Sequence, residues 1–171
     1  MAATLTSVNP AWLENSSRNM LMNSPPILIT NGQAWNAGMF LKSVTGALKI
    51  SSTSAANGVG ADAIQYHSLE TTVDPADATT TQVVGVVHPD DLWEINLSTA
   101  VASTIAGTVG IKYQLVVTGT TLNEAVAGNT HAVFNGVNPV WNERHYQDLS
   151  SDLQSRITVR VLSTAINAIG A

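Results

Sequence analysis

Two short apolar runs flank a tight turn in the stretch Met39-Phe40-Leu41-Lys42-Ser43-Val44-Thr45-Gly46-Ala47-Leu48-Lys49-Ile50. The runs have the length of β-strands, and the turn between them ends in Gly46, a residue type that adopts positive φ without a steric cost. The connection Ser43-Val44-Thr45-Gly46 thus places Gly at the position expected to need positive φ in a hairpin. This stretch therefore predicts an antiparallel β-hairpin, with Met39–Lys42 and Ala47–Ile50 in its strands.

Segments of the same kind recur on both sides of this hairpin. They are short, rich in β-branched side chains or alternating in polarity, and separated by Asn, Gly, Pro and Thr. They comprise Ile27–Thr30, Ile64–Leu69, Gln82–Val87, Leu92–Leu97, Ile111–Thr118, Ala132–Phe134, and a late alternation at Ile157, Val159 and Val161. Short strands joined by such turns are typical of all-β architectures. We therefore predict a mainly β protein, built as a small antiparallel β-barrel or sandwich.

The two ends of the chain differ from this strand-rich part. Asn9-Pro10 fits the start of a helix, and the apolar spacing behind it fits short helical turns. We therefore expect an N-terminal arm over residues 1–26, with a helix folded back on its own domain as the alternative. Residues 27–137 are expected to form the β-barrel or sandwich body. Because Asn138-Pro139 interrupts the sheet pattern, we expect residues 138–171 to be a C-terminal extension with a closing strand.

Large apolar side chains in the arm are candidates for partner contact. One arm motif, Val8-Asn9-Pro10-Ala11-Trp12, is matched at Val, Asn, Pro and Trp by Val137-Asn138-Pro139-Val140-Trp141. Tryptophan is a frequent anchor at protein interfaces, although each Trp can instead pack on its own core. The residues expected to contact a partner or a second subunit are Trp12, Leu13, Met20, Leu21, Met22 and Trp141.

The charge content is low. Charged residues make up 11% of the chain, against about 25% in soluble domains in general. The net charge is −5, and the seven Lys and Arg residues are scattered, whereas nucleic-acid binding needs them clustered. The sequence has no cysteine, no signal-peptide pattern and no apolar run of about 20 residues, so we expect no disulfide, no export and no membrane helix. Few charges also favour an assembly component over a lone soluble monomer.

Groups that could carry out catalysis are sparse. The four histidines have no spacing that would bring two of them to one metal ion. The densest polar cluster, His88-Pro89-Asp90-Asp91, can be interpreted as a metal site, but a proline turn capped by an Asp side chain explains it better. Motifs for a serine nucleophile, a phosphate loop and a dinucleotide site are missing from the sequence. We therefore predict no enzyme, no cofactor and no metal.

The order of three segments in the sequence resembles that of a known protein family. They are Ala37-Gly38-Met39-Phe40-Leu41-Lys42, then Thr45-Gly46-Ala47-Leu48-Lys49, and after a polar loop Val83-Val84-Gly85-Val86-Val87. In this order the region from Ala37 to Leu97 resembles the small β-barrel core of lambda-type head decoration (cement) proteins of tailed bacteriophages. The resemblance implies a homotrimer at three-fold or quasi-three-fold positions of a capsid. There it would bridge major capsid protein subunits and stabilise the shell without catalysis.

Such a protein is made in the host cytoplasm and located on the capsid surface of the virion, bound to neither nucleic acid nor a membrane. Two other function classes remain open. Another virion component, such as a connector, a tail part or a fibre base, would share this composition, and a long β-hairpin that completes a ring would favour it. A carbohydrate-binding module would need exposed coplanar aromatic rings, which Trp35, Trp93 and Trp141 are the candidates to supply.

Overall fold

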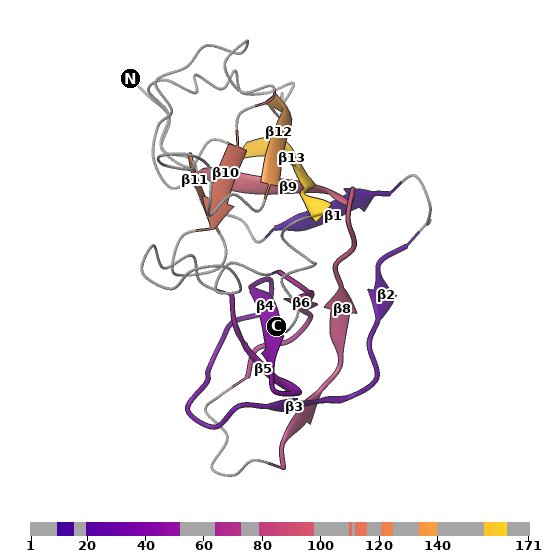
Figure 1. The fold of residues 1–171 in the computed structure, drawn as a ribbon, viewed down its shortest axis with the longest axis vertical. Helices are drawn as coiled ribbons and strands as arrows, with labels where there is room; N and C mark the ends of the chain where they lie inside the picture. Colours follow the sequence, from indigo (N-terminus) through magenta and orange to yellow (C-terminus); the bar gives the residue numbers. More distant parts are fainter. Residues whose placement is uncertain are drawn as a thin grey trace.

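The computed structural model describes residues 10–15, 20–51, 64–72, 79–97, 110, 112–115, 121–124, 134–139 and 156–163 of the chain. These residues form two curled β-sheets, which Figure 1 draws one above the other. The predicted mainly β fold, a small barrel or sandwich, is confirmed.

The sheet drawn lower in Figure 1 has seven strands and curls back on itself. Its strands are β2 (Met22–Asn23), β3 (Ile27–Ile29), β4 (Phe40–Val44), β5 (Ala47–Ile50), β6 (Tyr66–Ser68), β7 (Thr81–Gln82) and β8 (Val84–Val86). They are arranged in the order β2-β8-β6-β4-β5-β3-β7. Only Val83 separates β7 from β8, so the strand at one end of this order continues into a strand near the other end. The sheet therefore rounds into a barrel-like body.

The hairpin predicted from the sequence lies at the centre of this sheet. Leu41–Val44 pair in register with Ala47–Ile50. The two residues between the strands, Thr45 and Gly46, have φ values of 51° and 82°. Positive φ at both positions is the conformation that matches the strand twist. Threonine is unusual at such a φ, and here its Oγ1 donates to the carbonyl of Val44 at 2.7 Å. The hairpin prediction is confirmed, but the turn is shorter than the predicted Ser43–Gly46, because Ser43 and Val44 pair with Leu48 and Ala47 as part of β4.

The sheet drawn upper in Figure 1 is a closed ring with one added strand. Its strands are β1 (Ala11–Glu14), β9 (Leu92–Leu97), β10 (Lys112–Leu115), β11 (Thr121–Glu124), β12 (Phe134–Pro139) and β13 (Arg156–Val161). The order β9-β11-β10-β12-β13 returns to β9, because β13 also pairs with β9. Strand β1 shares the other edge of β9 with β11. The pairings are antiparallel as predicted, except β11 with β9 and β3 with β5.

Two clusters of buried side chains fill the two sheets and meet at β4. The lower cluster contains Ile29, Trp35, Met39, Leu41, Leu48 and Val84. The upper cluster contains Phe40, Ile64, Val87, Trp93, Ile95, Tyr113, Phe134, Ile157, Val159 and Val161. Successive side chains of a strand point to opposite faces, so Phe40 joins the upper cluster while Leu41 joins the lower one. The Phe40 ring lies 5.0 Å from Trp93 and 5.4 Å from Phe134 between centroids. Strand β4 therefore packs the two sheets into one body.

The N-terminal segment differs from the predicted arm. Ala11–Glu14 is an edge strand of the upper sheet and Met22–Asn23 an edge strand of the lower sheet. Trp12 lies opposite Trp93 in the β1–β9 pairing and packs against the upper cluster. Burial of a large aromatic side chain outweighs the local helix-start signal, because packing stabilises an element more than intrinsic propensity does. The helical turns expected within residues 1–26 are therefore wrong for the part of this segment that the structure describes.

Two strands in the second half of the chain also differ from expectation. Strand β12 continues through Asn138-Pro139, where the sequence predicts an interruption. Its pairing with β13 shifts register between Gly136 and Asn138, and such irregularities let proline occur within a sheet. Strand β11, Thr-Leu-Asn-Glu, was not predicted because Asn and Glu are depleted in strands.

The late strand is confirmed as the element that closes the upper sheet. Strand β13 pairs with β9 on one side and β12 on the other. Ile157, Val159 and Val161 are buried, as their alternation predicted, whereas Arg160 between them is exposed. The C-terminal part of the chain is thus required to complete the barrel.

Truncation of Phe40 should destabilise the whole protein. Phe40 is fully buried, and removing a buried Phe side chain costs about 3–5 kcal/mol. We expect Phe40→Ala to lower the free energy of unfolding by that amount in urea denaturation. Leu28→Ala, at a side chain that is 43% exposed, should cost less than about 1 kcal/mol. Similar effects of the two substitutions would contradict the shared core.

Candidate functional site

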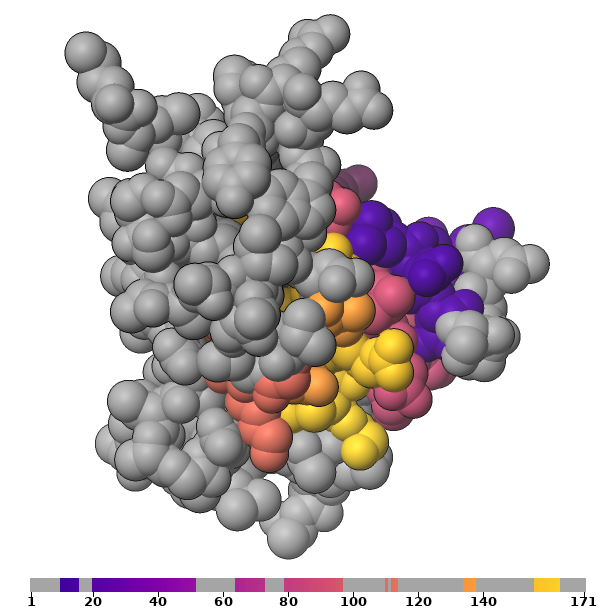
Figure 2. Space-filling model, turned by 90° about the horizontal axis from the view of Figure 1, so that it is seen from above, coloured from indigo at the N-terminus to yellow at the C-terminus, as the bar shows by residue number. Residues whose placement is uncertain are grey.

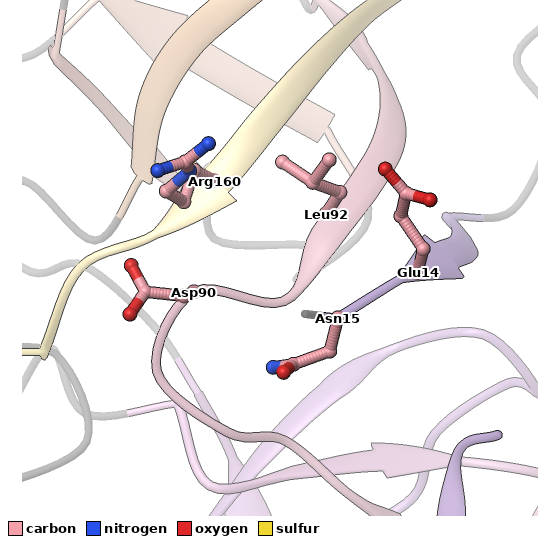
Figure 3. A pocket seen from close by; sticks show the side chains of 5 residues that line it. All are labelled: Glu14, Asn15, Asp90, Leu92 and Arg160. Atoms are coloured by element: carbon pink, nitrogen blue, oxygen red, sulfur yellow. The ribbon is translucent and has the colours of Figure 1, made fainter. Parts of the chain in front are cut away.

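A cleft of about 310 Å³ lies where β1, the turn before β9 and the end of β13 meet (Figure 3). It is lined by Glu14, Asn15, Asp90, Leu92 and Arg160. Glu14 and Asn15 come from the N-terminal segment, Asp90 and Leu92 from the turn and the start of β9, and Arg160 from β13. Residues far apart in sequence therefore supply one polar site at the surface.

The turn beneath the cleft is held by a buried carboxylate. Asp91 is fully buried, and its Oδ2 accepts a hydrogen bond from the backbone N–H of His88 at 2.9 Å. Its Oδ1 accepts one from Nδ2 of Asn15 at 2.8 Å, and the same Nδ2 donates to the carbonyl of Pro89 at 3.1 Å. These contacts place His88-Pro89-Asp90-Asp91 in a capped turn, as the sequence favoured over a metal site.

This turn is also tied to β13. The backbone N–H of Asp90 donates to the carbonyl of Val161 at 3.2 Å, and the N–H of Val161 donates to the carbonyl of Asp91 at 3.0 Å. Asp90 has a φ of 65°, a conformation that Asp tolerates better than most residues. The backbone at the cleft is therefore fixed on both sides.

The charged side chains of the cleft point into water. Glu14, Asp90 and Arg160 are all exposed, and none of the three makes an ion pair with another described residue. One guanidinium and two carboxylates thus remain available at the mouth of the cleft. The cleft therefore offers charges of both signs.

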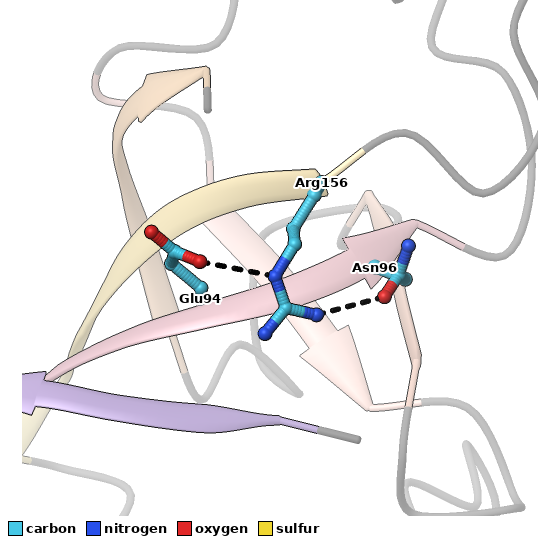
Figure 4. Close-up of polar contacts among 3 residues, drawn as sticks. All are labelled: Glu94, Asn96 and Arg156. Carbon is cyan, nitrogen blue, oxygen red and sulfur yellow. Dashed lines mark hydrogen bonds and ion pairs between the residues drawn. The ribbon is translucent and has the colours of Figure 1, made fainter. Parts of the chain in front are cut away.

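Arg156 lies on the same strand as Arg160, and unlike Arg160 it is hydrogen-bonded to other described side chains. Its Nε donates to Oε2 of Glu94 at 3.1 Å, and its Nη1 donates to Oδ1 of Asn96 at 2.9 Å (Figure 4). Both partners lie on β9, next to β13. Arg156 therefore stabilises the pairing that closes the ring.

The predicted contact residues separate into two groups. Trp12 and Leu21 are half-buried and pack against the upper cluster. Leu13, Met20 and Met22 are exposed, with relative accessibilities of 40%, 68% and 54%. We call these three exposed side chains the β1–β2 flank. In Figure 2 the N-terminal segments (indigo) are exposed at one side of the molecule. The sixth candidate, Trp141, lies outside the described residues.

Leu21 explains a glycine in the Val83–Val87 motif. A Cβ at Gly85 would lie 2.6 Å from Cδ2 of Leu21, closer than carbon atoms can approach. Glycine at this position therefore lets the N-terminal segment pack directly on β8.

Trp35 and Trp93 do not form a sugar-binding platform. Their accessibilities are 3% and 0%, and Nε1 of Trp35 donates to Oε1 of Gln82 at 3.0 Å inside the lower sheet. Stacking on a sugar ring would need an exposed aromatic face, so two of the three aromatic residues named for a carbohydrate-binding module are unsuited to that role.

His67 lies at the junction of the two sheets. Its ring is 5.5 Å from Phe40 and 4.7 Å from Trp93 between centroids, and neither ring nitrogen has a hydrogen-bond partner. Burial lowers the pKa of His67 to about 4, and the nearby carbonyls of Gly38 and Pro10 offset only part of that effect. The histidine is therefore neutral at physiological pH, and its role is to pack.

Sequence reasoning missed the cleft. Asp90 and Asp91 could be noted as a polar cluster, but nothing in the sequence relates them to Asn15 or to Arg160. Only the pairing of β9 with both β1 and β13 brings them together.

Comparison of the chain with protein-family models, with curated proteins and with solved structures gave no match. In the part of the chain that the structure describes, no helix has the length and apolar character needed to cross a membrane. The function must therefore be inferred from the fold and its surface.

Acid should destabilise the fold through His67. Below about pH 6.5 the unfolded histidine takes up a proton, whereas the folded one does so only near pH 4. The free energy of unfolding should therefore fall as the pH is lowered through this window, by roughly 3 kcal/mol from this group. His67→Phe should lose this component of the pH dependence, as measured by urea denaturation between pH 7 and pH 4.

The measured quantity is the slope of the free energy of unfolding against pH, which should be smaller in His67→Phe than in wild type. If His67→Phe and wild type lose stability in parallel, the buried neutral histidine is not responsible.

Proposed function

We propose that this protein is a structural virion component that binds the outside of a phage capsid and stabilises it by bridging major capsid protein subunits. The β1–β2 flank is its contact surface in this proposal. The observation that carries it is the exposure of Leu13 on β1, of Met22 on β2 and of Met20 just before β2, where β1 and β2 are edge strands of the two sheets. The resemblance of Ala37–Leu97 to lambda-type decoration proteins supplies the class of partner.

Exposed apolar side chains gain free energy when a partner removes them from water. A group of them at one part of a surface is characteristic of interaction sites. Two of the three are methionines, whose flexible thioether side chains adapt to irregular partner surfaces. The flank is therefore suited to adhesion.

Contact through side chains is favoured over the addition of a partner strand. The β1–β9 pairing shifts register between Trp12 and Glu14, and Glu14 places a charge at the edge. After β2 and a single Ser24 come Pro25 and Pro26. Bulges, charges and prolines at edge strands oppose pairing with another chain. The flank therefore presents Leu13, Met20 and Met22 rather than an open backbone edge.

The flank is also held in place before binding. Trp12 and Leu21 anchor its two strands on the upper cluster. The N–H of Ser24 donates to the carbonyl of Val84 at 2.8 Å, and its hydroxyl accepts from the N–H of Val84 at 3.2 Å. A contact surface that is already ordered loses less conformational entropy on binding. This supports attachment to a regular surface such as a shell.

The decoration hypothesis includes a homotrimer, which the resemblance implies, and any symmetric oligomer would multiply weak contacts. A connector, tail or fibre-base role is the other virion hypothesis. The β4–β5 hairpin has a two-residue turn and strands of five and four residues, so it is not the long ring-completing hairpin that would favour that role.

Substitution of the β1–β2 flank should abolish shell binding without unfolding the protein. Wild type should co-sediment with expanded capsid shells assembled from the major capsid protein of the same genome. The triple variant Leu13→Ser, Met20→Ser, Met22→Ser should bind at least about tenfold more weakly, because a few apolar anchors carry most of an interface's affinity.

A triple variant at other exposed apolar positions serves as the control. Leu28→Ser, Leu69→Ser and Val83→Ser alter side chains that are 43%, 40% and 39% exposed and should leave shell binding within about twofold. Wild type that stays in the supernatant with expanded shells would overturn the proposed function. Equal loss in both triple variants would overturn the choice of the flank.

A further inference from the structure

The charged cleft adjoins the β1–β2 flank. Leu13 of the flank directly precedes Glu14 and Asn15, which line the cleft, and it lies at the register shift of β1. A surface that covers Leu13 therefore also reaches the mouth of the cleft. Edge irregularities of this kind commonly aim side chains at functional sites.

The charges in the cleft lack partners among the described residues. Glu14 and Asp90 bring two carboxylates and Arg160 one guanidinium, and no ion pair joins them. Arg156 on the same strand, by contrast, is bonded to Glu94 and Asn96. The charges of the cleft thus differ from those of Arg156 and Glu94, which pair with each other within the fold.

The backbone at Asp90 and the neighbouring Asn15 side chain are held in place. Asp90 is held at a φ of 65° in a turn bonded to Val161. Asn15 is 8% exposed and bonded to the carbonyl of Pro89 and to Asp91. Fixed charges are the kind that impose register and orientation on an incoming partner.

We propose that this cleft receives an oppositely charged pair of side chains from the capsid surface that the flank contacts. A Lys or Arg of the partner pairs with Asp90 or with Glu14, which lie on opposite sides of the cleft in Figure 3, and an Asp or Glu of the partner pairs with Arg160. The inference rests on the proposed function and adds the chemistry of the partner: a basic and an acidic residue next to an apolar patch.

A protein surface suits the cleft better than a free small molecule. In an open cleft each ion pair competes with water and is screened by salt, so it contributes little on its own. When a partner covers Leu13 and the cleft together, water is displaced and the same ion pairs strengthen. The charges then select the partner and its orientation while the apolar flank supplies affinity.

The test compares two charge reversals of equal size in the shell co-sedimentation assay. Arg160→Glu reverses the cation of the cleft, and Lys112→Glu reverses an exposed cation on β10, which does not line the cleft. We expect Arg160→Glu to weaken binding to expanded shells at least tenfold at 50 mM salt, and Lys112→Glu to stay within twofold of wild type. Thermal melting of each variant checks that it is folded.

A second variant guards against misfolding of the first. Glu14→Gln with Asp90→Asn removes both carboxylates while keeping side chains of the same shape, and Asn accepts the positive φ of Asp90. It should also weaken binding at least tenfold and reduce the salt dependence. Free L-arginine at 10 mM should not displace wild type.

The outcomes separate the two proposals. If both cleft variants bind shells as tightly as wild type does, the proposal for the cleft is overturned, while the proposals for the flank and the function stand. An equal loss in Lys112→Glu shows that net charge alone matters, and it also overturns the cleft. Displacement by L-arginine would assign the cleft to a small ligand instead. Wild type that does not bind shells overturns the proposed function together with the partner assigned to the cleft.

Discussion

Phe40 and Leu41 point to opposite faces of β4, and the packing of both sheets depends on that alternation. Leu41 fills the lower barrel-like body, whereas Phe40 reaches Trp93 and Phe134 in the upper ring. His67 lies opposite Phe40 in the β4–β6 pairing and contacts Trp93 from the same side. The junction is thus aromatic, and burial there lowers the pKa of His67 to about 4, so the imidazole packed in it is neutral at physiological pH. The N-terminal segment depends on it too, because Trp12 and Leu21 pack on the upper cluster.

The sequence predicted those parts of the fold in which the two-residue period of a strand agrees with burial. The hairpin around Thr45-Gly46 and the late strand at Ile157, Val159 and Val161 are both of this kind. It failed near Trp12, where a local helix-start signal competes with the pairing to Trp93, a contact 81 positions away that the sequence does not reveal. The same limit applies to the candidate site. Of the residues chosen for partner contact, Leu13, Met20 and Met22 are exposed, whereas Trp12 and Leu21 pack against the upper cluster. The cleft depends on pairings between distant strands, which the sequence does not reveal.

The charged groups described above are of two kinds: some are bonded within the fold, and others are exposed at the cleft. Asp91 and Arg156 are bonded to neighbouring strands and turns, so they stabilise the barrel. Glu14, Asp90 and Arg160 remain at the surface beside an apolar flank. Under the proposed function, the apolar side chains provide affinity for the shell, and the charges of the cleft provide orientation. In this account the packed junction at Phe40 contributes to function by keeping β1 and β2, which belong to different sheets, in a fixed relative position.

The orientation of the bound chain tests this account most directly. Electron cryo-microscopy of expanded shells saturated with the full-length chain would reveal which face meets the shell. The account predicts added density on the outer surface, with β1 and β2 turned toward the major capsid protein. A chain bound with β1 and β2 facing solvent, or shells without added density, would contradict it.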